Sequence, residues 1–313
     1  MKDRLVIGTR GSELALWQAY YIKKELEKKN KNLLVEINII KTKGDKILDV
    51  ALSKIGDKGL FTKELEVELL NGTIDIAVHS LKDLQTALPK GLVIAAITKR
   101  HRVEDVLIAK KKGTTINTLK ENAVVATGSL RRKSQLLHLR PDIKIVELRG
   151  NVPSRIKKYK ESEWDAIILA RAGVERLKLD KNITSVISTK QILPAVGQGA
   201  LAIEVRKDNK FALNALKKIN DEKTFTAAMA ERAFLKALEG GCQVPIGAYA
   251  QVKTDGLYLD GFVGDIDGSV TFRKVLKGSK RKPEELGKKL AGEMKKAGAG
   301  KILKRIYSET RKG

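Results

Sequence analysis

Four short stretches of the chain combine hydroxyl or amide side chains with cations, each where a predicted strand gives way to a helix. Ligands of open α/β sheets bind beyond the carboxyl ends of the strands, where helix N-termini offer free N–H groups and a positive dipole end. Arginine forks match carboxylate and phosphate geometry. Together the stretches predict a site for a small polyanion, although ordinary helix capping and surface arginines would explain each one alone. They are Thr9-Arg10-Gly11-Ser12, Ser80-Leu81-Lys82-Asp83, Thr127-Gly128-Ser129-Leu130-Arg131-Arg132, and Arg149-Gly150-Asn151 with Ser154-Arg155.

Asp83 is an acid among these cations. In a basic stretch a carboxylate is either a structural salt-bridge partner or a catalytic group. As a catalytic group it could stabilise a cationic intermediate, accept hydrogen bonds from N–H groups and shuttle protons. The residues alone leave both interpretations open.

Cys242 is the only cysteine and follows the glycine pair Gly240-Gly241, which favours a tight, accessible turn. Isolated cysteines are most often small buried hydrophobic residues. This one lies between a predicted helix and a predicted strand, a position that suits a nucleophile or a point of covalent attachment. A cysteine–histidine hydrolase would need one of three histidines as its base, and none lies in a recognisable hydrolase motif. They are His79, His101 and His138.

The charge balance is strongly basic, with 62 Lys and Arg against 37 Asp and Glu and a formal net charge of +25. Nucleic acid is the first partner to consider for such a chain. Most of the basic residues are lysines, however, and runs such as Lys110-Lys111-Lys112 are typical of solvated helix surfaces. No recognition helix, zinc site or aromatic RNA-binding motif is recognisable, so we expect no nucleic-acid partner.

The composition indicates a soluble globular protein, with 42% hydrophobic and 32% charged residues. No apolar stretch has the form of a signal peptide or a membrane span. A single cysteine excludes an intramolecular disulfide and a multi-cysteine metal site, and it suits a reducing compartment. We therefore expect a cytoplasmic protein with no membrane partner.

Short apolar runs alternate with helical patterns, which predicts α/β domains with largely parallel sheets. Residues 42–59 read as a mobile loop or an ordinary surface connection, and residues 98–105 as a crossing between domains. The end of the chain, with strands at 246–253, 256–264 and 269–276 and a helix from Pro283, reads as a small α+β domain. The earlier predicted strands are 5–8, 34–40, 74–78, 92–97, 106–109, 123–126, 143–148, 166–170 and 200–205.

The motifs taken together resemble the porphobilinogen deaminase (hydroxymethylbilane synthase) family, from about residue 4 into the last domain. The joint set is far more specific than any one of its parts. It consists of Thr9-Arg10-Gly11-Ser12-Glu13-Leu14-Ala15-Leu16-Trp17-Gln18-Ala19, Lys58-Gly59-Leu60-Phe61-Thr62-Lys63-Glu64-Leu65-Glu66, His79-Ser80-Leu81-Lys82-Asp83, Ser129-Leu130-Arg131-Arg132, Leu148-Arg149-Gly150-Asn151-Val152 and Gly241-Cys242.

The resemblance implies three domains: 1–98 with 199–218, 99–198, and 219–313. The first two would be α/β domains similar to periplasmic binding proteins, with the active site between them, and the third a small α+β domain. It also implies a monomer. At three positions the chain departs from the pattern that we expect of the family, and none of them is assigned to the chemistry. They are Gln85 in place of proline, Gly128 in place of serine and Asp57 in place of glycine.

The resemblance also implies roles for individual residues. Cys242 matches the cysteine that carries a dipyrromethane cofactor through a thioether, and Asp83 matches the catalytic aspartate. Residues implied to bind the cofactor are Ser12, Lys82, Asp83, Thr127, Ser129, Arg131, Arg132, Arg149 and Arg155. Residues implied to bind the substrate are Arg10, Arg149, Arg155, Arg176, Phe61 and Lys58.

The reaction implied is a transferase reaction, the stepwise deamination and head-to-tail joining of four porphobilinogen molecules followed by hydrolytic release of hydroxymethylbilane. Asp83 would assist loss of ammonia and stabilise the resulting azafulvene-type cation. The product would pass to uroporphyrinogen-III synthase, and no metal is implied. A two-lobed anion- or solute-binding protein is the alternative.

Overall fold

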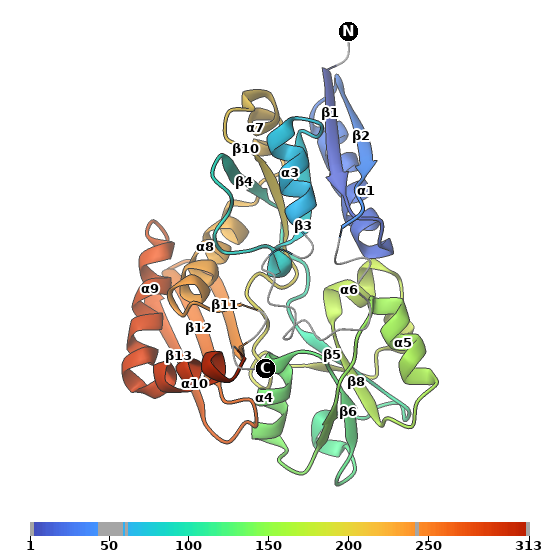
Figure 1. Ribbon diagram of the computed structural model, residues 1–313, viewed down its shortest axis with the longest axis vertical. Helices are drawn as coiled ribbons and strands as arrows, with labels where there is room; N and C mark the ends of the chain where they lie inside the picture. Colours follow the sequence, from blue (N-terminus) through green and yellow to red (C-terminus); the bar gives the residue numbers. More distant parts are fainter. Residues whose placement is uncertain (1–2, 43–58, 60–61, 242–243, 311–313) are drawn as a thin grey trace. The chain divides into compact units, whose positions relative to one another are not determined.

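The computed structural model describes residues 3–42, 59, 62–241 and 244–310 (Figure 1). These residues form two compact units, each of which is described by itself. The first comprises residues 3–42, 59, 62–101 and 199–225, and the second residues 102–198, 226–241 and 244–310. The boundaries given above for three domains stay a prediction.

The first unit is built on a five-stranded sheet of order β2-β1-β3-β10-β4. β1 pairs in parallel with β2 and β3, whereas β10 is antiparallel to both of its neighbours. Its elements are β1 (Asp3–Thr9), α1 (Glu13–Lys29), β2 (Leu33–Ile39), α3 (Lys63–Asn71), β3 (Ile76–Ser80), the short 3-10 turn η1 (Leu81–Asp83), β4 (Leu92–Ile97), β10 (Leu201–Arg206) and α7 (Lys210–Lys217).

Alternation along the strands assigns the helices to the two faces of this sheet. Ile76 and Val78 of β3 pack with the buried side of α1, including Ile22. Ala77, on the opposite face, packs with Leu65 of α3. Helices α1 and α3 therefore cover opposite faces, and their N-termini lie at the edge of the sheet where β1 and β3 end (Figure 1).

The second unit contains a five-stranded sheet of order β7-β6-β8-β5-β9, in which β5 is antiparallel to β8 and β9. β9 escaped sequence prediction because it has only three residues and exposes Val186. The elements are β5 (Asp105–Ala109), η2 (Ile116–Thr118), β6 (Val124–Ala126), α4 (Leu130–Leu139), β7 (Lys144–Val146), α5 (Val152–Lys160), β8 (Ala166–Ala170), α6 (Arg171–Arg176), η3 (Asp180–Asn182) and β9 (Ser185–Ile187).

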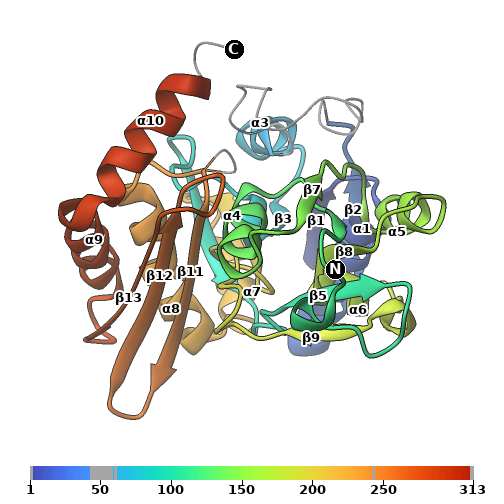
Figure 2. The ribbon, with the colours of Figure 1, turned by 90° about the horizontal axis from the view of Figure 1, so that it is seen from below.

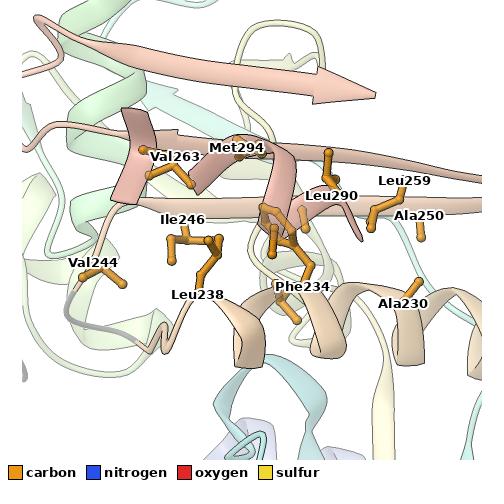
Figure 3. Close-up of a cluster of buried hydrophobic side chains, with 14 of the residues drawn as sticks. Ala230, Phe234, Leu238, Val244, Ile246, Ala250, Leu259, Val263, Leu290 and Met294 are labelled. Carbon is orange, nitrogen blue, oxygen red and sulfur yellow. The ribbon is translucent and has the colours of Figure 1, made fainter. Parts of the chain in front are cut away.

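The same unit contains an antiparallel sheet of three long strands, β11 (Ile246–Lys253), β12 (Gly256–Gly264) and β13 (Thr271–Gly278) (Figure 2). Helix α8 (Glu222–Ala237), which begins in the first unit, packs on it together with α9 (Pro283–Met294) and α10 (Gly300–Thr310); the short π-helical turn η4 (Lys295–Ala299) joins α9 to α10. Phe234 of α8 is fully buried and lies against strand and helix side chains such as Leu259 and Leu290 (Figure 3).

The observed architecture confirms the predicted fold class of two α/β sheets followed by a small antiparallel α+β region. Each five-stranded sheet has one antiparallel strand, β10 or β5, and is otherwise parallel. Among the described helices, none is both long and apolar enough to cross a bilayer.

Candidate functional site

A pocket in the first unit lies where β1 and β3 end and where α1 begins. It brings together Arg10, Ser12 and Asp83, three residues that the sequence analysis singled out. Its wall therefore offers a guanidinium, hydroxyls and a carboxylate within one small space. The full lining is Arg10, Ser12, Leu14, Ala15, Gln18, Thr62, Val78, His79, Ser80 and Asp83.

Ser12 is the N-cap of α1, with extended backbone angles and a side-chain oxygen that accepts a hydrogen bond from Ala15 N at 3.4 Å. The first backbone N–H groups of a helix have no acceptor within the helix. Together with Arg10, this helix end gives the pocket the donors and positive potential that suit an anion.

Ser80 is held by a residue that sequence reasoning missed. Gln18 of α1 is only 3% exposed, and its Nε2 donates to Ser80 Oγ at 2.8 Å. The Ser80 hydroxyl accepts in this bond, so its own proton can be donated elsewhere in the pocket. The two residues are 62 positions apart, and no local pattern connects them.

Asp83 closes the short turn η1, which is anchored by the buried Leu81. Leu81 N donates to Ala200 O at 3.0 Å, which ties the turn to the chain entering β10. Asp83 itself is exposed and lines the pocket, while its neighbour Lys82 is half-buried. The carboxylate is therefore accessible to a ligand in the pocket.

Behind the pocket, His79, Glu66 and Glu204 form a buried cluster that sequence reasoning also missed. His79 Nε2 lies 3.1 Å from Glu204 Oε2, and the Glu204 side chain is completely buried. Burial raises the pKa of Glu66 and the negative charge of Glu204 adds to the rise, whereas the charge of His79 opposes it.

In the second unit, Arg131 and Arg132 at the start of α4 both bind the buried carboxylate of Asp105. Arg131 Nη2 lies 2.9 Å from one oxygen and Arg132 Nη2 lies 2.7 Å from the other. Burial alone would raise the pKa of Asp105, but the charges and hydrogen bonds of the two arginines outweigh it and hold the pKa below its usual range. Gln198 Nε2 also donates to Asp105 Oδ1, at 3.0 Å.

Arg131 and Arg132 also donate to backbone carbonyls, of Leu193 at 2.7 Å and Ile168 at 2.9 Å respectively. Both side chains are about 5% exposed. The structure thus gives these two predicted cofactor ligands a structural task in the buried interior of the second unit. Their proposed contact with a cofactor stays a prediction.

Apart from Arg176, the remaining predicted residues of this unit also lie at or near strand-to-helix junctions. Ser129 caps α4 by accepting from Arg132 N at 3.5 Å, and the buried Thr127 accepts from Ser129 N at 3.3 Å. Arg149 Nε lies 2.6 Å from Glu147 Oε1, and Arg155 Nε donates to Gly150 O at 2.7 Å. The last predicted residue is Arg176, which is 8% exposed at the end of α6.

Three predicted site residues, Lys58, Phe61 and Cys242, lie outside the described residues, as do Asp57 and most of the predicted 42–59 loop. Gln85 and Gly128 are described. A Cβ at Gly128 would come within 2.8 Å of the backbone carbonyl of Leu148, so a side chain here would require the neighbouring backbone to shift.

Comparison with known proteins places two family models on the chain. A model described as the porphobilinogen deaminase dipyromethane cofactor binding domain matches residues 5–214, and the porphobilinogen deaminase C-terminal domain matches residues 225–296. A porphobilinogen deaminase from Chloroherpeton thalassium is 49% identical over 313 residues, covering 99% of each chain. One from Carboxydothermus hydrogenoformans is 50% identical over 306 residues, covering 98% of each.

Solved structures give more distant matches. The methionine-binding protein MetQ is 16% identical with a TM-score of 0.44, covering 74% of this chain and 94% of that chain. A periplasmic solute-binding protein of the TRAP class from Desulfovibrio salexigens is 12% identical with a TM-score of 0.42, covering 72% and 73%. These two likenesses are too distant to support an argument about the site.

Proposed function

Because the chain belongs to the porphobilinogen deaminase family, we propose that it joins four porphobilinogen molecules head to tail and releases hydroxymethylbilane by hydrolysis. The observation that carries this proposal is the match of both family domains, at residues 5–214 and 225–296, with relatives that align over nearly their whole length. It makes the protein a transferase of tetrapyrrole biosynthesis.

The family implies a dipyrromethane cofactor, and the donors of this chain suit such a group. Dipyrromethane is a pair of pyrroles with carboxylate arms, so its site requires cations, hydroxyls and helix N-termini. For the cofactor, the pocket supplies Ser12 and the start of α1. The other residues proposed to hold the cofactor are Lys82, Asp83, Thr127, Ser129, Arg131, Arg132, Arg149 and Arg155, with Cys242 as the point of thioether attachment.

The bound cofactor would supply the nucleophilic pyrrole carbon from which the product chain grows. The protein's own task is then to hold carboxylates and to stabilise positive charge. Arg10 in the pocket would bind a substrate carboxylate, assisted by arginines of the second unit and by two residues outside the described part of the chain. These are Arg149, Arg155, Arg176, Phe61 and Lys58.

Asp83 is the proposed catalytic residue. Its exposed carboxylate lines the pocket, where it can accept a hydrogen bond from a pyrrole N–H. When ammonia leaves the substrate, positive charge develops on the pyrrole, and a carboxylate held nearby lowers the energy of that state. Ser80, oriented by Gln18, offers a hydroxyl proton to the same ligand.

A two-lobed anion-binding protein is the competing function, because a pocket with Arg10 and Ser12 would also suit simple binding of a carboxylate. The two functions differ in turnover. A binding protein releases its ligand unchanged, whereas the deaminase releases ammonia as it joins the pyrroles. We further propose a cytoplasmic monomer whose product is consumed by uroporphyrinogen-III synthase.

The test combines intact mass with turnover. The purified wild-type chain should carry a covalent excess of two linked pyrroles, give colour with an acidic aldehyde reagent for pyrroles, and release four ammonia molecules for each hydroxymethylbilane. Cys242→Ser should lose the mass excess and the activity. An unmodified wild type that turns over normally would contradict attachment, and ligand binding without ammonia release would favour the binding protein.

A further inference from the structure

The cluster behind the pocket contains two buried carboxyl groups and one imidazole. Glu66 is 5% exposed and Glu204 is fully buried. Within the described part of the chain, Glu66 Oε1 and Glu204 Oε1 have no hydrogen-bond partner. His79, which bonds to Glu204 Oε2 at 3.1 Å, is the group of the cluster that can carry positive charge.

The charges in this cluster cannot all balance if both acids ionise. A protonated His79 neutralises one carboxylate, and a second carboxylate would then be a buried charge without a counter-ion. Such a charge is costly, and a buried carboxyl group avoids the cost by keeping its proton. Glu204 has the direct bond to His79, which leaves Glu66 as the acid that stays neutral.

Because the cluster lies behind the pocket, the protonation of Glu66 affects the binding of anions there. His79 and Thr62 both line the pocket that also contains Arg10 and Ser12. Thr62 is the N-cap of α3, and Glu66 lies one turn further along that helix. An ionised Glu66 would therefore add negative charge directly behind the wall that attracts anions.

We infer that Glu66 is a positioning residue for anionic ligands: it stays a neutral acid, and its proton prevents a second negative charge from forming behind the pocket wall. The inference rests on the proposed function, because porphobilinogen enters with two carboxylates. A unit charge about 10 Å from a bound ion changes the dissociation constant of that ion roughly tenfold where the effective dielectric constant is ~20.

The described elements packed on α3 are β1, β3, β4 and β10. The titratable groups that they present to Glu66 are His79 and Glu204, and both enter the charge balance above. Arg206 of β10 lies at the other end of α3, where its Nη1 donates to Leu69 O at 2.9 Å. On α3 itself, Glu64 is half-buried and Lys63 is exposed.

Glu66→Gln mimics the neutral acid and gives the decisive comparison. In the wild type, the KM for porphobilinogen should rise roughly tenfold as the pH is raised through the ionisation of Glu66, while kcat changes less. In Glu66→Gln this rise should be absent. Glu231→Gln is the matched control: it neutralises another fully buried carboxylate, which accepts from Gly197 N and Ala250 N in the second unit, and should leave the KM profile as in wild type.

Two readouts do not require activity. Infrared difference spectra should show the carbonyl stretch of a protonated carboxylic acid in the wild type that disappears as Glu66 ionises and is absent from Glu66→Gln. Since the pKa of Glu66 is raised on folding, its contribution to stability is present at low pH and is lost as pH rises through the folded-state pKa, so Glu66→Gln should melt higher than wild type once Glu66 has ionised.

A wild-type KM that does not change with pH, a Glu66→Gln variant that keeps the rise, or a missing carboxylic acid band would each overturn the inference. Failure of the proposed function gives a different result. In that case neither variant releases ammonia, while the infrared band and the melting comparison still report on Glu66.

Discussion

Replacing Arg132 by leucine should destabilise the fold before it affects any ligand. The Arg132 guanidinium is 2.7 Å from Asp105 Oδ1, and the Asp105 side chain is fully buried. Leucine removes one of the two cations that balance this carboxylate. Breaking a buried ion pair by removing one partner costs about 3–5 kcal/mol, because the remaining charge is left uncompensated.

The cost should lie at the lower end of that range, about 3 kcal/mol, because Asp105 keeps its bonds from Arg131 and Gln198. With an unfolding entropy of ~2.1 cal/mol/K per residue over 313 residues, this corresponds to a fall in Tm of about 5 °C. Thermal unfolding followed by circular dichroism measures the shift, and intact mass of the folded fraction reports whether a cofactor is present.

A double-mutant cycle with Asp105→Asn separates the ion pair from general disruption. Asp105→Asn alone leaves two buried arginines without their carboxylate, so the double variant Asp105→Asn/Arg132→Leu should cost about 1–3 kcal/mol less than the sum of the single variants. An unchanged Tm in Arg132→Leu, or strictly additive costs, would refute the structural reasoning. Loss of the cofactor at full stability would instead show that Arg132 acts on the cofactor.

The same pair predicts a shift in acid unfolding. The arginines hold the pKa of Asp105 below its usual range in the folded state, so its stabilising contribution is complete above the ordinary carboxyl pKa of about 3.9 and is lost as pH falls below it. Arg132→Leu reduces this contribution, and the variant should therefore unfold at a higher pH than wild type during acid titration.

Two further predictions concern the pocket of the first unit and the hydrophobic core around the antiparallel sheet. Asp83→Asn should lower turnover by about 100-fold or more because the stabilising charge is lost, whereas Asp83→Glu should retain residual activity. Because Asp83 is exposed, the melting temperatures of both variants should match wild type. Equal activity of the two variants would exclude a role for the charge. Phe234→Ala should lower the free energy of unfolding in urea by about 3–5 kcal/mol, because a fully buried ring is removed from between α8 and the antiparallel sheet. A loss below about 1 kcal/mol would contradict the packing in Figure 3.

Local patterns located every described strand except β9, although some bounds are shifted: the buried strand β3 begins at Ile76, two residues later than predicted. The strands at 246–253 and 256–264 match β11 and β12 residue for residue, and 269–276 differs from β13 by two positions. The reversed directions of β5 and β10 depend on where the chain re-enters each sheet. That is a long-range property, and a run of apolar residues does not encode it.

The charged groups show the limit of sequence reasoning more clearly. Residues 98–105 read as a crossing between domains, yet Asp105 begins β5 and is fully buried. The sequence shows Arg131 and Arg132 as cations at a helix start, but their counter-ion lies 26 and 27 positions away. Pairings across a fold, including Gln18 with Ser80 and His79 with Glu204, become visible only once the strands are placed.

Helix capping and anion binding are compatible at these junctions. Ser12 and Ser129 each cap a helix by accepting one backbone N–H through the side-chain oxygen. This bond leaves the hydroxyl proton, and the other N–H groups of the first turn still have no acceptor within the helix. A capped N-terminus thus retains most of its capacity to donate to an anion.

What distinguishes a functional junction from a plain cap is therefore the cation beside it. In the first unit Arg10 lines the pocket together with Ser12, whereas Arg131 and Arg132 beside Ser129 turn inward to Asp105. The same sequence signature can thus position a cation for a ligand or for the core, and only the position of the counter-ion separates the two.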